Sequence, residues 1–156
     1  MTLWSDGRYR MEYVCQDGFG YLYLWDGRVP VATMYMHVVC ERFSMTIDQL
    51  IHSLSEKFMK DKLSELKDEM IARENSYVAY IDYFMKRLSL NFEDARILAV
   101  HFTGMGPEAI AIKFGLSQES VRLSFDRIMN AYSNKGIVVD DTIFTENPFV
   151  YYGNKE

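Results

Sequence analysis

The sequence has few cysteines, and they form no motif. Cys15 and Cys40 are the two among 156 residues, and no Cys-x-x-Cys pair occurs. This scarcity argues against a disulfide-rich scaffold and against the common cysteine zinc sites. Both cysteines lie in segments that we predict to be strands. We interpret them as reduced, buried thiols that could face each other across a sheet.

Long apolar runs are also lacking. No stretch approaches the roughly 18 unbroken apolar residues that a membrane span needs. Residues 1–10 are polar and do not contain the apolar core of a signal peptide. We therefore expect a soluble, cytoplasmic protein with no membrane partner.

Motifs for catalysis or metal binding are missing as well. His37, His52 and His101 are scattered in apolar contexts, and no two stand at the spacing of metal ligands. There is no Gly-x-Ser-x-Gly motif and no phosphate-binding glycine loop, because residues 18–20 form only a turn. We predict that the protein is not an enzyme, that its histidines are structural, and that it uses no cofactor and no metal.

Positive charge is in the minority. The chain has 17 lysines and arginines against 22 aspartates and glutamates, a formal net charge of −5. Proteins that bind nucleic acids usually carry a basic total or a basic patch. The balance therefore predicts weak non-specific binding to DNA, although only the contacting face needs to be positive.

What is present divides into three parts, which together predict an α+β fold. Residues 1–88 should form a small antiparallel β-meander with helices, for dimerisation or sensing. Residues 89–133 should form a helix-turn-helix domain. Residues 134–156 form a tail that is too apolar for free chain and should pack on the body.

Alternating residues and turn signals define the first part. Residues 8–15 alternate with period two, residues 21–25 form a second strand, and residues 31–39 form a third, with a strong hairpin signal at Asp26-Gly27. Aromatic side chains could line a small-molecule pocket, but they are more typical of a core or an interface. They are Tyr9, Tyr13, Tyr21, Tyr23, Trp25 and Tyr35.

Helical patterns follow the predicted sheet. Thr46 and Gln49 are spaced as a capping box. An apolar stripe at helical spacing then runs over residues 47–71, and residues 77–88 form another helix. The stripe could be a dimerisation surface or could cover the sheet, and the sequence leaves both open.

Caps and turns mark three helices in the third part. Asn91 can cap the first of them and Gly104 can end it, while Pro107 suits the first position of the second. Gly115 allows a tight turn, after which Ser117 caps a third helix over residues 118–132. Two helices joined by a short turn with glycine are the helix-turn-helix unit.

Residues 90–128 carry a set of apolar, small and polar side chains in one register. These are Leu90, Asp94, Ile97, Leu98, Gly104, Ile110, Ala111, Phe114, Gly115, Leu116, Ser117, Ser120, Val121, Arg122, Phe125 and Ile128. Through these positions the stretch resembles, without a gap, the C-terminal domain of LuxR/FixJ-type (GerE-type) transcription regulators. The same stretch is similar, in second place, to the DNA-binding C-terminal region of sigma factors.

The resemblance implies that the third helix enters the major groove of DNA. Arg122 would contact guanine or phosphate, and Glu119 could accept from a cytosine amino group. Between residues 89 and 132 there are four basic and five acidic residues, and Leu123 stands where the family tends to have a polar side chain. The predicted DNA-binding residues are Ser117, Gln118, Glu119, Ser120, Arg122, Leu123, Ser124, Lys113 and Arg127.

Two functions follow as expectations. The first is a transcription regulator that binds double-stranded DNA as a homodimer, because two symmetric half-sites double the contacts. The second is an interaction protein that keeps the fold but binds another regulator or RNA polymerase. A positive collar of Lys113, Arg122 and Arg127 around the third helix would favour DNA, whereas an apolar or acidic face would favour a protein partner.

Overall fold

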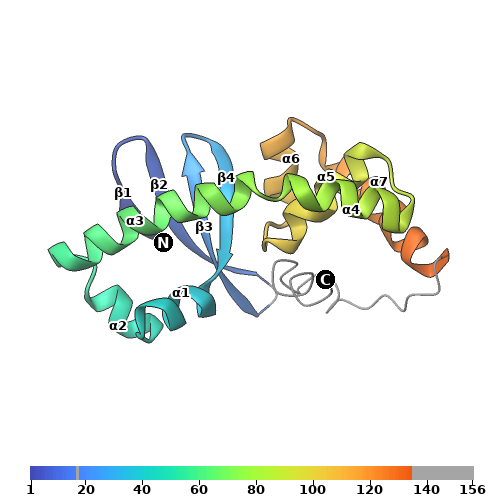
Figure 1. Cartoon of the computed structure of the whole chain (residues 1–156). Coiled ribbons are helices and arrows are strands. Elements are labelled where there is room, and N and C mark those ends of the chain that lie inside the picture. Colours follow the sequence, from blue (N-terminus) through green and yellow to red (C-terminus); the bar gives the residue numbers. More distant parts are fainter. Residues whose placement is uncertain (17, 135–156) are drawn as a thin grey trace. The chain divides into compact units, whose positions relative to one another are not determined.

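A computed structural model describes residues 1–16 and 18–134 and shows the predicted α+β fold (Figure 1). The chain forms two compact units, Met1–Glu74 and a second unit that begins at Asn75. The sequence placed this boundary after Leu88, so the two divisions differ by one helix. That helix joins the second unit because Phe84 stacks on Phe102, with ring centroids 5.5 Å apart.

A four-stranded antiparallel meander forms the sheet of the first unit. Its strands are β1 (Thr2–Ser5), β2 (Tyr9–Gln16), β3 (Phe19–Asp26) and β4 (Val29–Tyr35), in the order β1-β2-β3-β4. The meander was predicted, but strand β1 was not, because its four residues are too few to give a periodic signal. At the β3–β4 turn Gly27 adopts a φ of 62°, which glycine accepts without a steric penalty.

The register of the strands places apolar side chains on one face of the sheet. Met11 pairs with Leu24, and Leu22 pairs with Met34. Helix α3 (Lys57–Asn75) covers this face, as Figure 1 shows. Its stripe of Met59, Leu63, Leu66 and Met70 is buried in the same cluster as those strand residues. The apolar stripe therefore covers the sheet.

Two shorter helices, α1 (Met36–Phe43) and α2 (Ile47–His52), connect the sheet to α3. The predicted capping box of α2 is confirmed: the Gln49 amide donates to Thr46 Oγ1 at 3.1 Å, and the Thr46 amide donates to Gln49 Oε1 at 2.9 Å. Residues 53–56 interrupt the helical stripe that the sequence suggested was continuous.

Helix α1 overturns the predicted placement of the cysteines. The third strand was expected to reach residue 39 but ends at Tyr35, and Cys40 lies half-buried in α1. The β-branched residues there favour a strand locally, but helical spacing buries both Met36 and Val39 in the core. Cys15 is exposed, so the prediction of two buried thiols on facing strands was wrong.

The second unit is helical in its described part. It contains α4 (Val78–Leu88), α5 (Phe92–Phe102), α6 (Pro107–Phe114) and α7 (Gln118–Asn134). Among the described residues, no helix combines the length and apolar character needed to cross a membrane. The tail predicted over residues 134–156 lies outside the described residues apart from Asn134, which ends α7.

Candidate nucleic-acid interface

Helices α6 and α7 and the turn between them form the predicted helix-turn-helix. Gly115 ends α6 with a φ of 67°, and the Leu116 amide donates to the Ala111 carbonyl at 2.9 Å. Ser117 begins the next helix, because its Oγ accepts from the Ser120 amide at 3.0 Å. Ile110, Val121 and Ile128 are fully buried behind this turn. The local signals of glycine and serine therefore set the geometry that the sequence predicted.

An ion pair fixes α7 to α5. Arg127 donates from Nε and Nη2 to the two carboxylate oxygens of Asp94, at 2.8 and 2.9 Å. Asp94 is only 2 % exposed, and Arg127 also donates to Ser124 Oγ at 3.1 Å. The carboxylate raises the pKa of the Arg127 guanidinium through this hydrogen bond. A bidentate pair of this kind holds two helices in one orientation.

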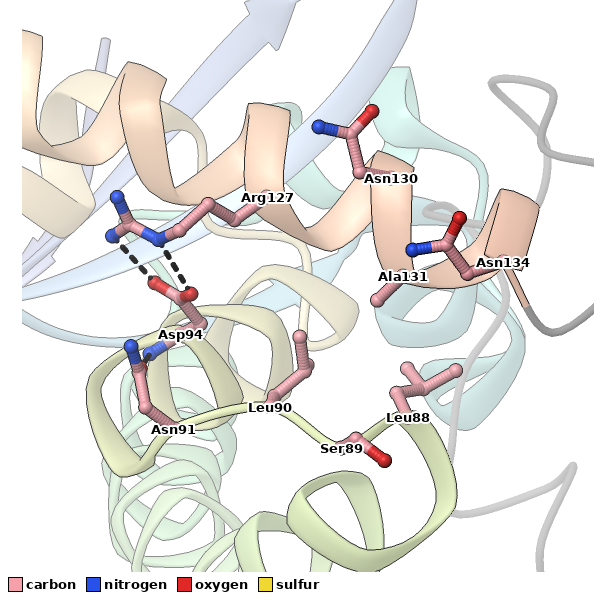
Figure 2. A pocket seen from close by; sticks show the side chains of 9 residues that line it. All are labelled: Leu88, Ser89, Leu90, Asn91, Asp94, Arg127, Asn130, Ala131 and Asn134. Carbon is pink, nitrogen blue, oxygen red and sulfur yellow. Dashed lines mark hydrogen bonds and ion pairs between the residues drawn. The ribbon is translucent and has the colours of Figure 1, made fainter.

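Two of the predicted contact residues, Ser124 and Arg127, take part in this network of hydrogen bonds. Ser124 was expected to face phosphate, but it is 1 % exposed and lies inside the unit. The guanidinium of Arg127 is turned toward Asp94 (Figure 2). Ser124 is therefore withdrawn from solvent, whereas the Arg127 side chain is paired with Asp94 and remains 51 % exposed.

A second arginine connects α5 to α6. Arg96 donates from Nη2 to both carboxylate oxygens of Glu93, each at 2.7 Å. Its guanidinium carbon lies 3.9 Å from the centroid of the Phe114 ring, a cation–π contact. The side chain of Asn91 caps α5 by accepting from the Asp94 amide at 2.8 Å, as predicted. Helix α5 therefore contacts α6 through Arg96 and α7 through Asp94.

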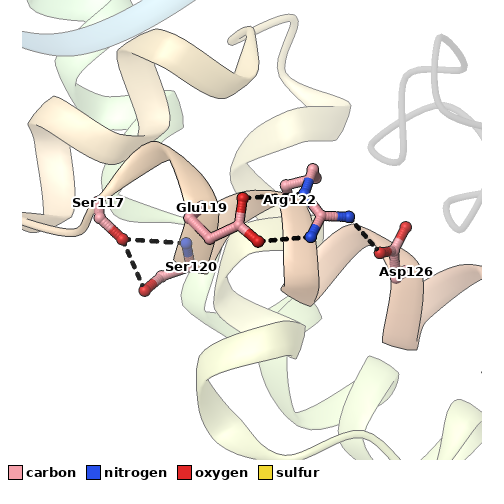
Figure 3. A network of polar contacts seen from close by, with 5 residues as sticks. All are labelled: Ser117, Glu119, Ser120, Arg122 and Asp126. Carbon is pink, nitrogen blue, oxygen red and sulfur yellow. Dashed lines mark hydrogen bonds and ion pairs between the residues drawn. The ribbon is translucent and has the colours of Figure 1, made fainter.

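The first two turns of α7 present polar side chains to solvent. Gln118, Glu119, Ser120 and Arg122 are exposed there, together with Leu123. At the start of the helix, Ser117 Oγ donates to Ser120 Oγ at 2.9 Å, so the two hydroxyls lie side by side (Figure 3). These residues form one continuous outer face, opposite the buried Val121 and Ile128.

Arg122 lies between two carboxylates of its own helix. It donates from Nε to Glu119 Oε2 at 3.0 Å, from Nη2 to Glu119 Oε1, and from Nη1 to Asp126 Oδ2 at 2.9 Å (Figure 3). The hydrogen bond from Arg122 lowers the pKa of Glu119 and raises that of Arg122 itself. All three side chains are more than half exposed, so water and salt screen these pairs.

The predicted positive collar is therefore largely neutralised. Arg127 is paired with Asp94 and Arg122 with two acids, while Lys113 lies 6.0 Å from the Phe114 ring. Residues 75–134 contain six basic and six acidic side chains. The outer face of α7 combines donors and acceptors without a net positive charge.

His101 is packed against the back of this site. Its ring lies edge-on to Phe125, with centroids 5.0 Å apart, and its Nδ1 is 3.1 Å from the Met105 carbonyl oxygen. Burial lowers the pKa of the imidazole, so the neutral form is favoured. These contacts agree with the structural role predicted for this histidine. Within residues 1–16 and 18–134, no three histidine, cysteine or acidic side chains are grouped to hold a metal.

A pocket of about 610 Å³, with a mixed apolar and polar lining, lies beside the Asp94–Arg127 pair (Figure 2). The sequence did not predict it, because its walls come from the α4–α5 turn and from the far end of α7. It is lined by Leu88, Ser89, Leu90, Asn91, Asp94, Arg127, Asn130, Ala131 and Asn134.

No family model, no curated protein and no solved structure matches this chain.

Proposed function

We propose that the second unit binds double-stranded DNA as part of a transcription regulator, with the first two turns of α7 in the major groove. The observation that supports this proposal is that the two sides of α7 have different surroundings. Its inner side is fixed to α5 by the Arg127–Asp94 pair, while its outer side presents hydrogen-bonding groups on a rigid helix. A helix that enters the groove needs both properties.

Each outer residue has a role in this proposal. Arg122 donates to guanine O6 and N7, and Glu119 accepts from a cytosine amino group. Gln118 offers an amide to a neighbouring base, and Leu123 can contact a thymine methyl group. The hydroxyls of Ser117 and Ser120, with Lys113, contact the phosphate backbone. Ser124 and Arg127 are left out of this set, because they hold α7 against α5.

The regulator would act in the cytoplasm as a homodimer, without a cofactor and without an enzymatic activity. One helix-turn-helix offers too few base contacts for useful specificity, and a two-fold dimer doubles them. Analytical ultracentrifugation of the full chain with and without a bound site would test the dimer. A single half-site bound by a monomer would contradict it.

A second function is favoured by the surface composition. Three apolar side chains of α6 and α7 are partly exposed: Ile112 at 49 %, Leu123 at 42 % and Met129 at 45 %. The basic and acidic side chains of residues 75–134 are equal in number, so this part of the chain has no net charge. Such a surface suits a protein partner such as RNA polymerase or another regulator. This function and DNA binding make opposite predictions in the experiment that follows.

Selection from random duplex DNA tests the proposal. The full chain is mixed with a random duplex pool at low salt, and the bound DNA is sequenced over successive rounds. We expect a specific sequence to be enriched and its binding to weaken as salt is added. Arg122→Ala should lose that enrichment, since the guanine contact is worth roughly 1–3 kcal/mol for a bidentate pair.

The matched control is Arg87→Ala, which removes the same charge from an exposed position on α4. It should enrich the same sequence as the unmodified protein. If no sequence is enriched even at low salt, the DNA-binding proposal is wrong, and the exposed apolar residues of α6 and α7 become the surface for a protein partner.

A further inference from the structure

Three charged side chains form a row along the outer face of α7. Glu119, Arg122 and Asp126 are spaced by three and four residues, so they follow each other on one side of the helix. Figure 3 shows Arg122 between the two acids, with its guanidinium in contact with both. The row has a net charge of −1, at the position where a DNA-binding helix would meet a polyanion.

The two acids use part of the donor capacity of Arg122 and leave part of it available. A guanidinium has five N–H groups. Three of them donate to Glu119 and Asp126, so Nη1 and Nη2 each keep one further N–H. Two donors on neighbouring nitrogens are what a bidentate contact to guanine requires. The acids therefore orient the guanidinium and leave it able to contact a base.

The carboxylates of Glu119 and Asp126 also repel the phosphates of the DNA backbone. Non-specific binding depends on the positive charge that a protein places near the phosphate backbone. Arg122 is the sole basic side chain among residues 117–126, and its charge is more than balanced by the two carboxylates. A DNA duplex without matching bases would then gain little from this helix, whereas a matching site can bind Arg122 and Glu119 together.

We propose that Glu119 and Asp126 are specificity-determining residues that hold Arg122 for base contact and suppress binding to non-matching DNA. This inference rests on the proposed function, because it assumes that α7 meets duplex DNA. It adds that the acidic residues of α7 are functional parts of the interface, and that neutralising them strengthens binding to non-matching DNA and so reduces discrimination.

The test compares Glu119→Gln, Asp126→Asn and the double variant with the unmodified chain. Fluorescence anisotropy gives the Kd for the duplex selected by the unmodified protein and for a scrambled duplex of the same length, over a series of salt concentrations. Glu108→Gln is the matched control, because Glu108 is an exposed acid at the start of α6 and has no contact with Arg122. Circular dichroism verifies that each variant is folded.

For the double variant we expect tighter binding to the scrambled duplex, on the order of 10-fold at low salt, with a steeper dependence on salt. Binding to the selected duplex should change less, so the ratio of the two Kd values falls. Glu108→Gln should leave that ratio close to the unmodified value.

Two results would overturn the inference, and they differ from each other. If the unmodified chain selects a site but the double variant keeps the same Kd ratio and salt dependence, the specificity role is wrong and the proposed function stands. If neither the unmodified chain nor the double variant binds any duplex at low salt, the inference and the proposed function both fail.

Discussion

The inner and outer sides of α7 use the same chemistry in two environments. On the inner side, Arg127 forms two hydrogen bonds with Asp94, whose carboxylate is almost fully buried. On the outer side, Arg122 forms three hydrogen bonds with Glu119 and Asp126, and all three side chains are more than half exposed. A buried carboxylate depends on its partner, whereas an exposed one is hydrated when the partner leaves. The number of hydrogen bonds therefore does not indicate which arginine stabilises the fold.

Removal of the inner arginine gives the largest expected effect. Arg127→Ala leaves the Asp94 carboxylate buried without its partner, which should cost about 2 kcal/mol of unfolding free energy. The value is set below that of a fully buried pair, because Arg127 itself is half exposed. Thermal unfolding should show a melting temperature lower by about 4–8 °C.

Arg127→Lys is the control for this change. It keeps the charge but lacks the planar fork, so it should lie between Arg127→Ala and the unmodified protein. Equal melting temperatures for Arg127→Ala and the unmodified protein would show that the inner pair does not stabilise α7.

The next effect in size comes from His101 as the pH falls. Its pKa is lowered in the folded state by burial, so the unfolded chain takes up the proton first. The contribution of His101 is fully present above the unfolded value of about 6.5 and is lost as the pH falls toward the folded pKa. Within that window, the unfolding free energy should decrease by up to about 1.4 kcal/mol per pH unit.

Urea unfolding at a series of pH values measures this dependence. His101→Gln cannot take up a proton there, so its unfolding free energy should change less between pH 6.5 and pH 5. A variant with the same pH dependence as the unmodified protein would assign the acid sensitivity to other groups.

The smallest effect on stability is expected for the outer arginine. Arg122→Ala removes three hydrogen bonds, but all its partners are exposed and remain hydrated. Its melting temperature should equal that of the unmodified protein within the error of the measurement, although the proposed function predicts that the same variant no longer enriches a specific DNA sequence. A loss of stability as large as that of Arg127→Ala would remove the distinction between the two sides of α7.

Local signals explain how much of the fold was predictable. Asn91, Pro107, Gly115 and Ser117 act within one turn of the chain, and each is found at the helix end where the sequence predicts it. Helix α1 was missed because its β-branched residues favour a strand, while packing against the sheet selects a helix.

The contacts of the candidate site were less predictable than its helices. The Asp94–Arg127 pair joins residues 33 positions apart, and no local pattern specifies such a pairing. As a result, the sequence places Arg127 and Ser124 on the DNA-facing surface, whereas the structure buries Ser124 and pairs the half-exposed Arg127 with Asp94. The row of Glu119, Arg122 and Asp126 is different, because its spacing of three and four residues is visible in the sequence.

The most direct measurement is a titration of the isotopically labelled full chain with the selected duplex, followed by NMR of the backbone amides. The proposed function predicts that the largest chemical-shift changes lie at residues 117–123 of the turn and α7, with smaller changes near Lys113. Changes confined to α4 and α5, or none at duplex concentrations above the Kd measured by anisotropy, would contradict a DNA-binding role for the outer face of α7.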